Sequence, residues 1–229
     1  MNLDRILPLF APMLRRALRN KQLARESQFA AAPPAAGRVV FLGDSITEWT
    51  DWADWFPNLA TTNRGIGGQA IRDIHARLET AIIEPRAISL LVGTNDLHGL
   101  GASSDVDRIA EQMDRLVNRI RQMAPNATLL VNSVMPRSRH FRERLVRLNL
   151  HYRRIASSAG ATYIDLWPAL ADEHGAIRRE LTTDGLHLSI AGYRVWISEL
   201  RPYLDAFSPA HLTRQRRNGV ATIENMPSG

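Results

Sequence analysis

The chain has 229 residues, of which 45% are hydrophobic and 23% are charged, as expected for a globular protein with one large domain. It contains no cysteine, which excludes disulfides, iron–sulfur clusters, thiolate zinc sites and a cysteine nucleophile. No stretch reaches the ~18 consecutive apolar residues of a membrane-spanning helix.

The net charge of +6 is concentrated at the two ends of the chain. Residues 1–38 carry +5 and residues 205–229 carry +1, whereas residues 39–204 are neutral. A nucleic-acid-binding protein more often carries its excess charge on a basic face of the folded domain. We therefore expect no nucleic-acid partner.

Residues 1–37 are expected to form a helical extension followed by a linker. Apolar residues recur there at a helical spacing, although Pro8 and Pro12 argue against one straight helix. The run at 30–37 is rich in alanine and proline, which is typical of a linker. We interpret this segment as an attachment that lies on the domain, a partner or a membrane surface. Its removal is then expected to leave the chemistry unchanged.

The same segment bears on localisation. In a secretory signal, positive charge precedes the apolar run, whereas here the strongest charges, Arg15, Arg16 and Arg19, follow it. We predict a cytoplasmic protein. Export or membrane association through residues 1–30 is the alternative.

From residue 38 onward, strand and helix patterns alternate. The first, third and fourth strand candidates are short apolar runs, typical of strands buried on both faces, and the second is more polar. The expected strands are 39–42, 61–63, 88–92, 129–134 and 161–165, and the expected helices are 46–56, 69–80, 104–123, 139–158 and 189–204. This alternation predicts an α/β domain over 38–207 with a five-stranded parallel sheet covered on both faces. A flexible basic tail is expected over 208–229.

Polar or glycine-rich segments follow the strands, where ligands bind in an open parallel sheet. Three come directly after the first, second and third strands, and one precedes the last helix. They are Gly43-Asp44-Ser45, Arg64-Gly65-Ile66-Gly67-Gly68, Gly93-Thr94-Asn95-Asp96 and Asp184-Gly185-Leu186-His187. The four segments are expected to converge on one edge of the sheet.

These segments contain the groups that acyl transfer needs. Ser45 lies at a strand-to-helix turn and is a nucleophile once His187 takes its proton. Asp184 can fix the imidazole tautomer. The oxyanion of the tetrahedral intermediate needs hydrogen-bond donors, and the Ser45 N–H, a glycine N–H of the second segment and the Asn95 amide can supply them.

With these four blocks in order, the chain resembles the SGNH hydrolases, also called the GDSL family of esterases and lipases. The residues in and around the first two blocks are similar to those of the platelet-activating-factor acetylhydrolase-like branch of this family, which favours small acyl groups. The resemblance spans about residues 38–204. It implies a three-layer, flavodoxin-like sandwich, no metal and no cofactor. It also implies Ser45 as nucleophile, His187 as base, Asp184 as the residue that orients it, and Gly68 and Asn95 in the oxyanion hole. Whether Gly67 or Gly68 supplies the N–H stays open.

Three further residues are candidates for substrate contacts. Asp44 precedes the nucleophile and is also expected to support its loop. Trp52 belongs to a series of tryptophans, at 49, 52 and 55, that is typical of a packed helix face but can also border an acyl pocket. Arg137 begins a basic run at the active edge and can meet a phosphate or carboxylate, the alternative being a solvated helix face.

Two other kinds of site are weighed and set aside. The run from Gly65 to Ala70 fits a dinucleotide-binding fingerprint, but the strand before it is short and polar. The histidines show no paired ligand spacing, so we expect no metal site.

The sequence thus predicts a serine esterase that hydrolyses small-molecule esters, with short acyl groups, through an acyl-enzyme. The alternatives are a thioesterase or lysophospholipase using the same site, and a non-catalytic carbohydrate- or lipid-binding module. The latter does not explain why serine, histidine, aspartate and asparagine occur together, because binding requires no proton relay. The oligomeric state is left open.

Overall fold

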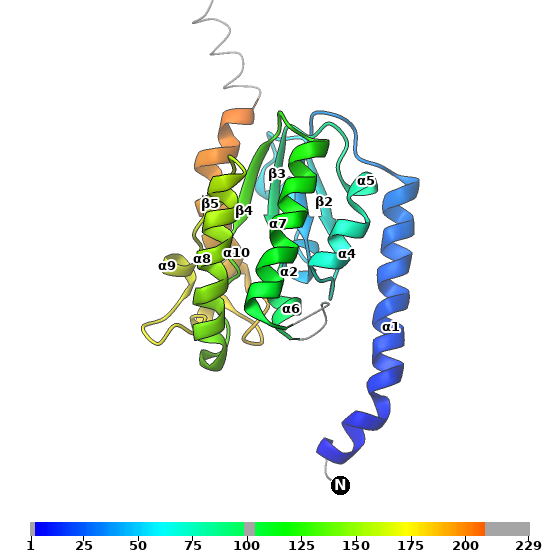
Figure 1. Ribbon diagram of the computed structural model, residues 1–229, viewed down its shortest axis with the longest axis vertical. Helices are drawn as coiled ribbons and strands as arrows, with labels where there is room; N and C mark the ends of the chain where they lie inside the picture. The colour runs from blue at the N-terminus through cyan, green and yellow to red at the C-terminus, as the bar shows by residue number, and fades with distance from the viewer. Residues whose placement is uncertain (1–2, 99–103, 209–229) are drawn as a thin grey trace, which may run out of the picture.

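A five-stranded, all-parallel sheet forms the centre of the computed structural model, which describes residues 3–98 and 104–208 (Figure 1). The strand order is β2-β1-β3-β4-β5. The strands are β1 Val39–Gly43, β2 Thr61–Gly65, β3 Ala87–Leu91, β4 Thr128–Asn132 and β5 Thr162–Ile164. The predicted fold class is therefore confirmed, with all five strands close to their expected places.

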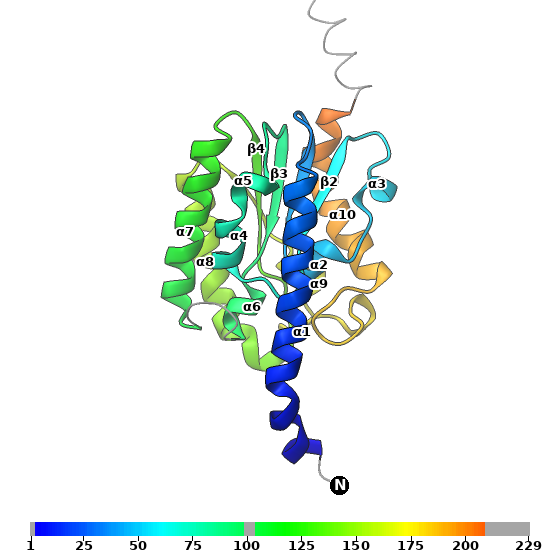
Figure 2. The ribbon, with the colours of Figure 1, turned by 90° about the vertical axis from the view of Figure 1, so that its right-hand side faces the viewer.

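Helices cover both faces of the sheet. The α-helices are α1 Leu3–Ala31, α2 Ser45–Glu48, α3 Trp52–Trp55, α4 Ile71–Ala76, α5 Leu78–Ala81, α6 Thr94–Leu97, α7 Val106–Met123, α8 Arg142–Ser158, α9 Trp167–Leu170 and α10 Ile190–Leu204. Short 3-10 turns are η1 Arg139–Phe141, η2 Arg179–Leu181 and η3 Asp205–Phe207. Helices α4, α5, α7 and α8 pack on one face and α10 on the other, with α2, α3 and α9 (Figure 2).

The alternation of side chains along the strands explains the two cores. Val40 and Leu42 of β1 belong to the core under α7 and α8, whereas Val39 and Phe41 belong to the core under α10. Both sets are buried because helices cover both faces, as the apolar first strand predicted.

Two predicted helices are each divided in two. The helix expected over 46–56 is α2 and α3, because Asp51 begins the second by accepting a hydrogen bond from the Ala53 N–H at 2.9 Å. The helix expected over 69–80 is α4 and α5, which meet at Arg77. The Arg77 side chain is buried and donates to the Arg64 carbonyl oxygen at 2.8 Å.

Helix α1 stands alongside the domain, next to α4 and α5 (Figures 1 and 2). It is continuous from Leu3 to Ala31, and residues 32–38 lead into β1. Its C-terminal end is tied to β2, because an Arg64 guanidinium N–H donates to the Ala32 carbonyl oxygen at 2.7 Å. The domain boundary expected at residue 38 stays a prediction.

None of the helices within the described ranges is both long and apolar enough to span a bilayer. The tail expected at 208–229 lies, from residue 209 on, outside the described residues.

The strand register brings the functional segments to one edge. Gly43 at the end of β1 pairs with Gly65 of β2 on one side and with Leu91 of β3 on the other. The segments that follow these strands therefore leave the sheet side by side, at the end where α2, α6 and α9 lie (Figure 1).

Candidate active site

Ser45 lies at the first position of α2, directly after β1. Asp44 caps this helix, since its Oδ1 accepts the Ile46 N–H at 3.0 Å. In this tight strand-to-helix turn the Ser45 hydroxyl points toward His187, and Ser45 Oγ lies 3.0 Å from His187 Nε2. That distance is a hydrogen bond, the geometry in which an imidazole can take the proton of a nucleophilic hydroxyl.

Asp184 holds the other side of the imidazole, with Oδ2 2.6 Å from His187 Nδ1. Its second oxygen, Oδ1, accepts the backbone N–H groups of Leu186 and His187 at 2.9 and 2.7 Å. Gly185 occupies the left-handed region of this turn with φ +84°. Ser45, His187 and Asp184 thus form one chain of hydrogen bonds built from two segments far apart in sequence.

The electrostatics of Asp184 suit this arrangement. Burial alone would raise its pKa, but the hydrogen bonds from the His187 side chain and from the His187 and Leu186 N–H groups outweigh that effect. The pKa of Asp184 therefore lies below its ordinary value. An ionised carboxylate next to Nδ1 keeps the proton there and leaves Nε2 free to act as a base.

The glycine loop, defined here as residues 65–69, lies against Ser45. A Cβ placed on Gly67 would come within 3.6 Å of the Ser45 Cβ. The Gly67 N–H donates to Glu48 Oε2 at 2.8 Å, whereas the Gly68 N–H has no hydrogen-bond partner among the described residues. Gly68 has φ +75°, a conformation that favours glycine. Of the two glycine N–H groups, that of Gly68 is therefore the one that no described residue occupies.

Asn95 is the second residue of α6, in the segment that follows β3, and it is buried. Its Nδ2 donates to the Gln69 carbonyl oxygen at 2.9 Å, which leaves the second N–H of the amide for another acceptor. Next to it, the buried carboxylate of Asp96 accepts the Ile71 N–H at 3.2 Å. Both residues therefore connect the segment after β3 to the glycine loop and the start of α4.

Burial also shifts the pKa values of two carboxyl groups near the site. It raises the pKa of Asp44 to about 7 and that of Asp96 to about 7, although backbone N–H groups that bond to each oppose the shift. One oxygen of Asp44, Oδ2, is buried with no hydrogen-bond partner among the described residues. Asp44 lies beneath the nucleophile, as a support of its turn.

A small cavity lies among residues on either side of Ser45 in the sequence and the strands next to them. Its lining is mostly apolar and comes from the ends of β1, β3 and β4, the segments that follow them, and the segment before α10: Asp44, Ile46, Leu91, Val92, Thr94, Val134, Met135, Arg137 and Leu186. Its volume is about 10 Å³, which is room for roughly one water-sized group.

Arg137 lies in this cavity wall rather than on a solvated helix face. It is 6% exposed, it donates to Thr94 Oγ1 at 3.2 Å, and its guanidinium lies 4.5 Å from the centre of the Phe141 ring. It also contacts His98 Nε2. Burial lowers the pKa of His98, and the Arg137 charge lowers it further. Arg137 is thus beside the site, with a buried charge.

Trp52, in contrast, is not brought to the site. It is 1% exposed, stacks on Phe41 with ring centroids 3.7 Å apart, and donates from Nε1 to the Thr47 carbonyl oxygen. Trp52 therefore belongs to a packed helix face, as the sequence analysis gave for the tryptophan series, and the prediction that it contacts substrate is wrong.

Trp49 of the same series is the tryptophan that reaches the site, and the sequence analysis did not single it out. Its indole stacks on the His187 imidazole with ring centroids 3.9 Å apart, and it is 54% exposed. The sequence signal that could have identified Trp49 was its position four residues after Ser45, one helical turn along. There its backbone N–H donates to the Ser45 carbonyl oxygen. Glu48, the partner of Gly67, was also missed.

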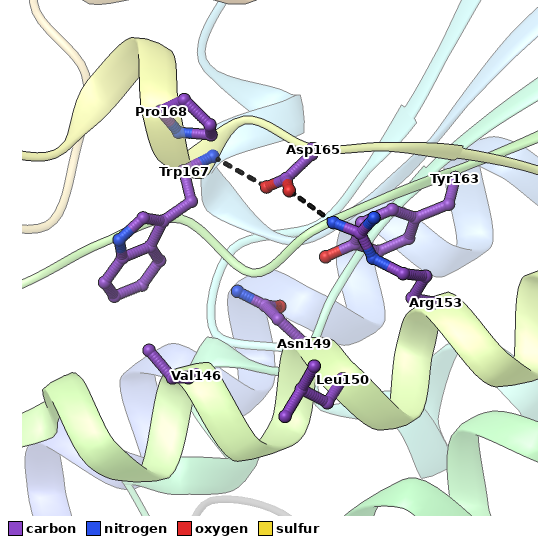
Figure 3. A pocket seen from close by; sticks show the side chains of 8 residues that line it. All are labelled: Val146, Asn149, Leu150, Arg153, Tyr163, Asp165, Trp167 and Pro168. Carbon is purple, nitrogen blue, oxygen red and sulfur yellow. Dashed lines mark hydrogen bonds and ion pairs between the residues drawn. The ribbon is translucent and has the colours of Figure 1, made fainter.

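A larger hollow of about 180 Å³ lies elsewhere, between α8, β5 and α9 (Figure 3). Arg153 donates to Asp165 across it at 2.6 Å, and Asp165 also accepts the Trp167 N–H. The residues that line it include none from the four segments. Within the part of the chain that the structure describes, no group of three or more His, Asp or Glu residues is arranged to hold a metal ion.

Comparison with known proteins places the chain in a family. Residues 41–195 match the model of the GDSL-like Lipase/Acylhydrolase family. Over 166 residues, the chain is 31% identical to the platelet-activating factor acetylhydrolase IB subunit alpha1 of Bos taurus, a match that covers 68% of this chain and 69% of that protein. The human protein of the same name is 30% identical over 166 residues, covering 68% and 70%.

Solved structures agree on the fold. A structure from Streptococcus pneumonia, described as a platelet activating factor, superposes with a TM-score of 0.78 at 24% identity and covers 86% of this chain and 99% of that one. A GDSL-like lipase from Bacteroides thetaiotaomicron superposes with a TM-score of 0.69 at 21% identity, covering 80% and 97%. The family model spans more than half of the chain, and the chain accordingly belongs to the GDSL-like lipase/acylhydrolase family of hydrolases that act on ester bonds.

Proposed function

We propose that the protein is a carboxylesterase that removes short acyl groups, of the acetyl type, from small-molecule esters by way of an acyl-enzyme on Ser45. The observation that carries the proposal is the unbroken chain of hydrogen bonds from Ser45 Oγ to His187 Nε2 and from His187 Nδ1 to Asp184. A serine in that arrangement is poised for nucleophilic attack.

In the first half of the reaction, His187 Nε2 takes the Ser45 proton while Oγ attacks the ester carbonyl carbon. The tetrahedral oxyanion receives hydrogen bonds from the N–H groups of Ser45 and Gly68 and from the Asn95 amide. His187 then gives its proton to the leaving alcohol. In the second half, water repeats the sequence on the acyl-enzyme and releases the acid. Asp184 stabilises the imidazolium in both halves.

Two observations favour a short acyl group. The cavity lined by Asp44 and Ile46, the neighbours of Ser45, has room for roughly one water-sized group, and apolar side chains form most of its wall. The curated relatives at about 30% identity are named as acetylhydrolases, enzymes whose acyl group is acetyl. Arg137 in the same wall favours substrates with a negative charge close to the ester.

The experiment that tests the proposal is a chain-length series of p-nitrophenyl esters with wild type and Ser45→Ala. We expect kcat/KM to be highest for acetate and to fall steeply with chain length, and Ser45→Ala to be inactive throughout. A matched acetyl thioester and a lysophospholipid in the same panel test the two alternative substrate classes. A preference for either over the acetate ester would replace the proposed substrate.

The location of the protein stays a prediction. The basic N-terminal segment and the apolar spacing within it support contact with an anionic membrane surface. Cosedimentation of the full chain with vesicles of anionic lipid, at low and high salt, would test that contact.

A further inference from the structure

Helix α1 contacts the glycine loop directly. The Gln22 side chain is 7% exposed, and its Nε2 donates to the Gly67 carbonyl oxygen at 3.0 Å. One turn further along the helix, Glu26 Oε1 accepts the Gln69 side-chain amide at 2.7 Å. A Cβ on Gly68 would come within 3.0 Å of Leu18 Cδ2 and within 3.2 Å of Gln22 Nε2. The helix therefore lies against the segment that contains both candidate oxyanion glycines.

The contact extends through Gln69 to Asn95. Gln69 is 0% exposed, and its side-chain oxygen accepts a hydrogen bond from Arg77 Nε at 2.6 Å. Its backbone oxygen accepts one N–H of the Asn95 amide. Because that bond fixes the plane of the amide, the position of Gln69 decides where the second N–H points. Glu26, Gln69 and Asn95 thus form one chain of contacts.

The last turns of α1 are anchored independently of these contacts. Phe29 is buried, and its ring lies 4.4 Å from the Arg64 guanidinium and 4.7 Å from that of Arg25. Arg64 also holds the Ala32 carbonyl oxygen. This anchor fixes the position of the helix along β2, so that Gln22 and Glu26 lie opposite the glycine loop.

We propose that Gln22 and Glu26 are positioning residues for ester hydrolysis, which make α1 part of the catalytic unit rather than an attachment to it. They hold the glycine loop so that the Gly68 N–H and the free Asn95 N–H point to one place beside Ser45. This inference rests on the proposed function, because it concerns the donors of that site. It revises the expectation that residues 1–37 are dispensable for the chemistry.

The test uses the full chain with Gln22→Ala, Glu26→Ala and the double variant. The exposed Lys21 of the same helix gives the matched control, Lys21→Ala. Glu26→Gln is the conservative variant, because its amide oxygen can still accept from Gln69. Each protein is assayed for kcat and KM with p-nitrophenyl acetate, and for inhibition by a short alkylboronic acid, which forms a tetrahedral adduct on serine.

We expect each alanine variant to lower kcat by roughly 10-fold to 100-fold with KM little changed, as for a small misplacement of reacting groups. Boronic acid inhibition should weaken by a similar factor, since the adduct carries the oxygen that the donors hold. Lys21→Ala should equal wild type, and Glu26→Gln should recover most of the activity. A double variant that is folded and retains the wild-type kcat would overturn the proposal.

Hydrogen exchange of the backbone separates this inference from the proposed function. A peptide that spans residues 65–71 should exchange faster in the double variant than in wild type, and a peptide from β4 should not. If the wild type is inactive toward esters, only the proposed function is contradicted. Hydrogen exchange of residues 65–71 still shows whether α1 orders the glycine loop, because it does not depend on activity. Unchanged exchange in residues 65–71 would contradict the positioning role.

Discussion

The indole of Trp49 stacks on the imidazole of His187, with ring centroids 3.9 Å apart and planes 24° from parallel. In the proposed reaction this imidazole becomes positively charged in each half. A cation over an aromatic face is stabilised by ~0.5–2 kcal/mol, depending on exposure. We therefore expect Trp49 to stabilise the transition state as well as to orient the imidazole ring.

Replacement of Trp49 tests this contribution. Trp49→Ala is expected to lower kcat for p-nitrophenyl acetate by about 3-fold to 10-fold, the equivalent of roughly 1 kcal/mol. Trp49→Phe keeps an aromatic face and should lose less. Steady-state kinetics of the three proteins measures the difference. Equal losses in both variants would show that the indole shape, and not its π face, is what His187 requires.

Asn95 is assigned a role that depends on the sign of charge. Removal of one oxyanion donor costs ~10²–10³ in kcat, so Asn95→Ala should lower kcat by that factor with KM little changed. Asn95→Asp keeps the size but sets a carboxylate beside the developing oxyanion and opposite the Gln69 carbonyl oxygen. It should be worse than alanine near neutral pH. Wild-type activity of the aspartate variant would exclude Asn95 as a donor.

The buried carboxyl of Asp44 predicts a pH-dependent stability. Burial raises its pKa in the folded protein to about 7, above the ordinary value of 3.8 that applies on unfolding. Between pH 4 and 7 the folded state thus binds more protons than the unfolded state. The contribution of the Asp44 carboxyl to stability is full below about pH 4 and is lost as the pH rises through 7.

Urea unfolding of wild type and Asp44→Asn at pH 5.5 and pH 8 measures this effect, since the asparagine stays neutral at both pH values. The free energy of unfolding of the variant minus that of wild type should be larger at pH 8 than at pH 5.5, because only wild type loses stability as the pH rises. A difference that is the same at both pH values would contradict the raised pKa.

Arg137 begins a basic run, and a partly exposed charge at this position would be expected to act on anionic esters in a salt-sensitive way. Its burial changes that expectation, because buried charges are screened much less by salt. Arg137→Gln should raise KM for esters with an anionic acyl or leaving group more than for neutral esters, and the difference should persist at high salt. Equal effects on both ester types would assign Arg137 a structural role with Thr94 and Phe141.

The sequence analysis was most successful where local pattern and tertiary structure agree. The apolar run that became β1 is buried on both faces, so its composition alone indicated a central parallel strand. The four segments could be placed at one edge because the carboxyl ends of parallel strands share an edge. Their residue types then indicated the chemistry.

What the sequence did not reveal depends on contacts between distant elements. Trp49 and Trp52 lie in similar sequence surroundings, and only the packing of α2 and α3 against Phe41 and His187 decides which is core and which is site. Gln22 and Glu26 lie about 45 residues before their partners in the glycine loop, on a helix whose docking no local pattern predicts. The 69–80 helix likewise divides at Arg77, whose buried side chain bonds to the Arg64 carbonyl oxygen of β2, a contact between distant elements.

The activated serine is tested most directly by labelling with a fluorophosphonate and locating the adduct by peptide mass spectrometry. Attack by Ser45 Oγ on phosphorus expels fluoride and leaves a stable phosphonate ester on the enzyme. We predict one label per chain, on Ser45, with labelling absent in Ser45→Ala and slowed by orders of magnitude in His187→Ala. An unlabelled wild type, or a label that remains in Ser45→Ala at the wild-type rate, would contradict the account.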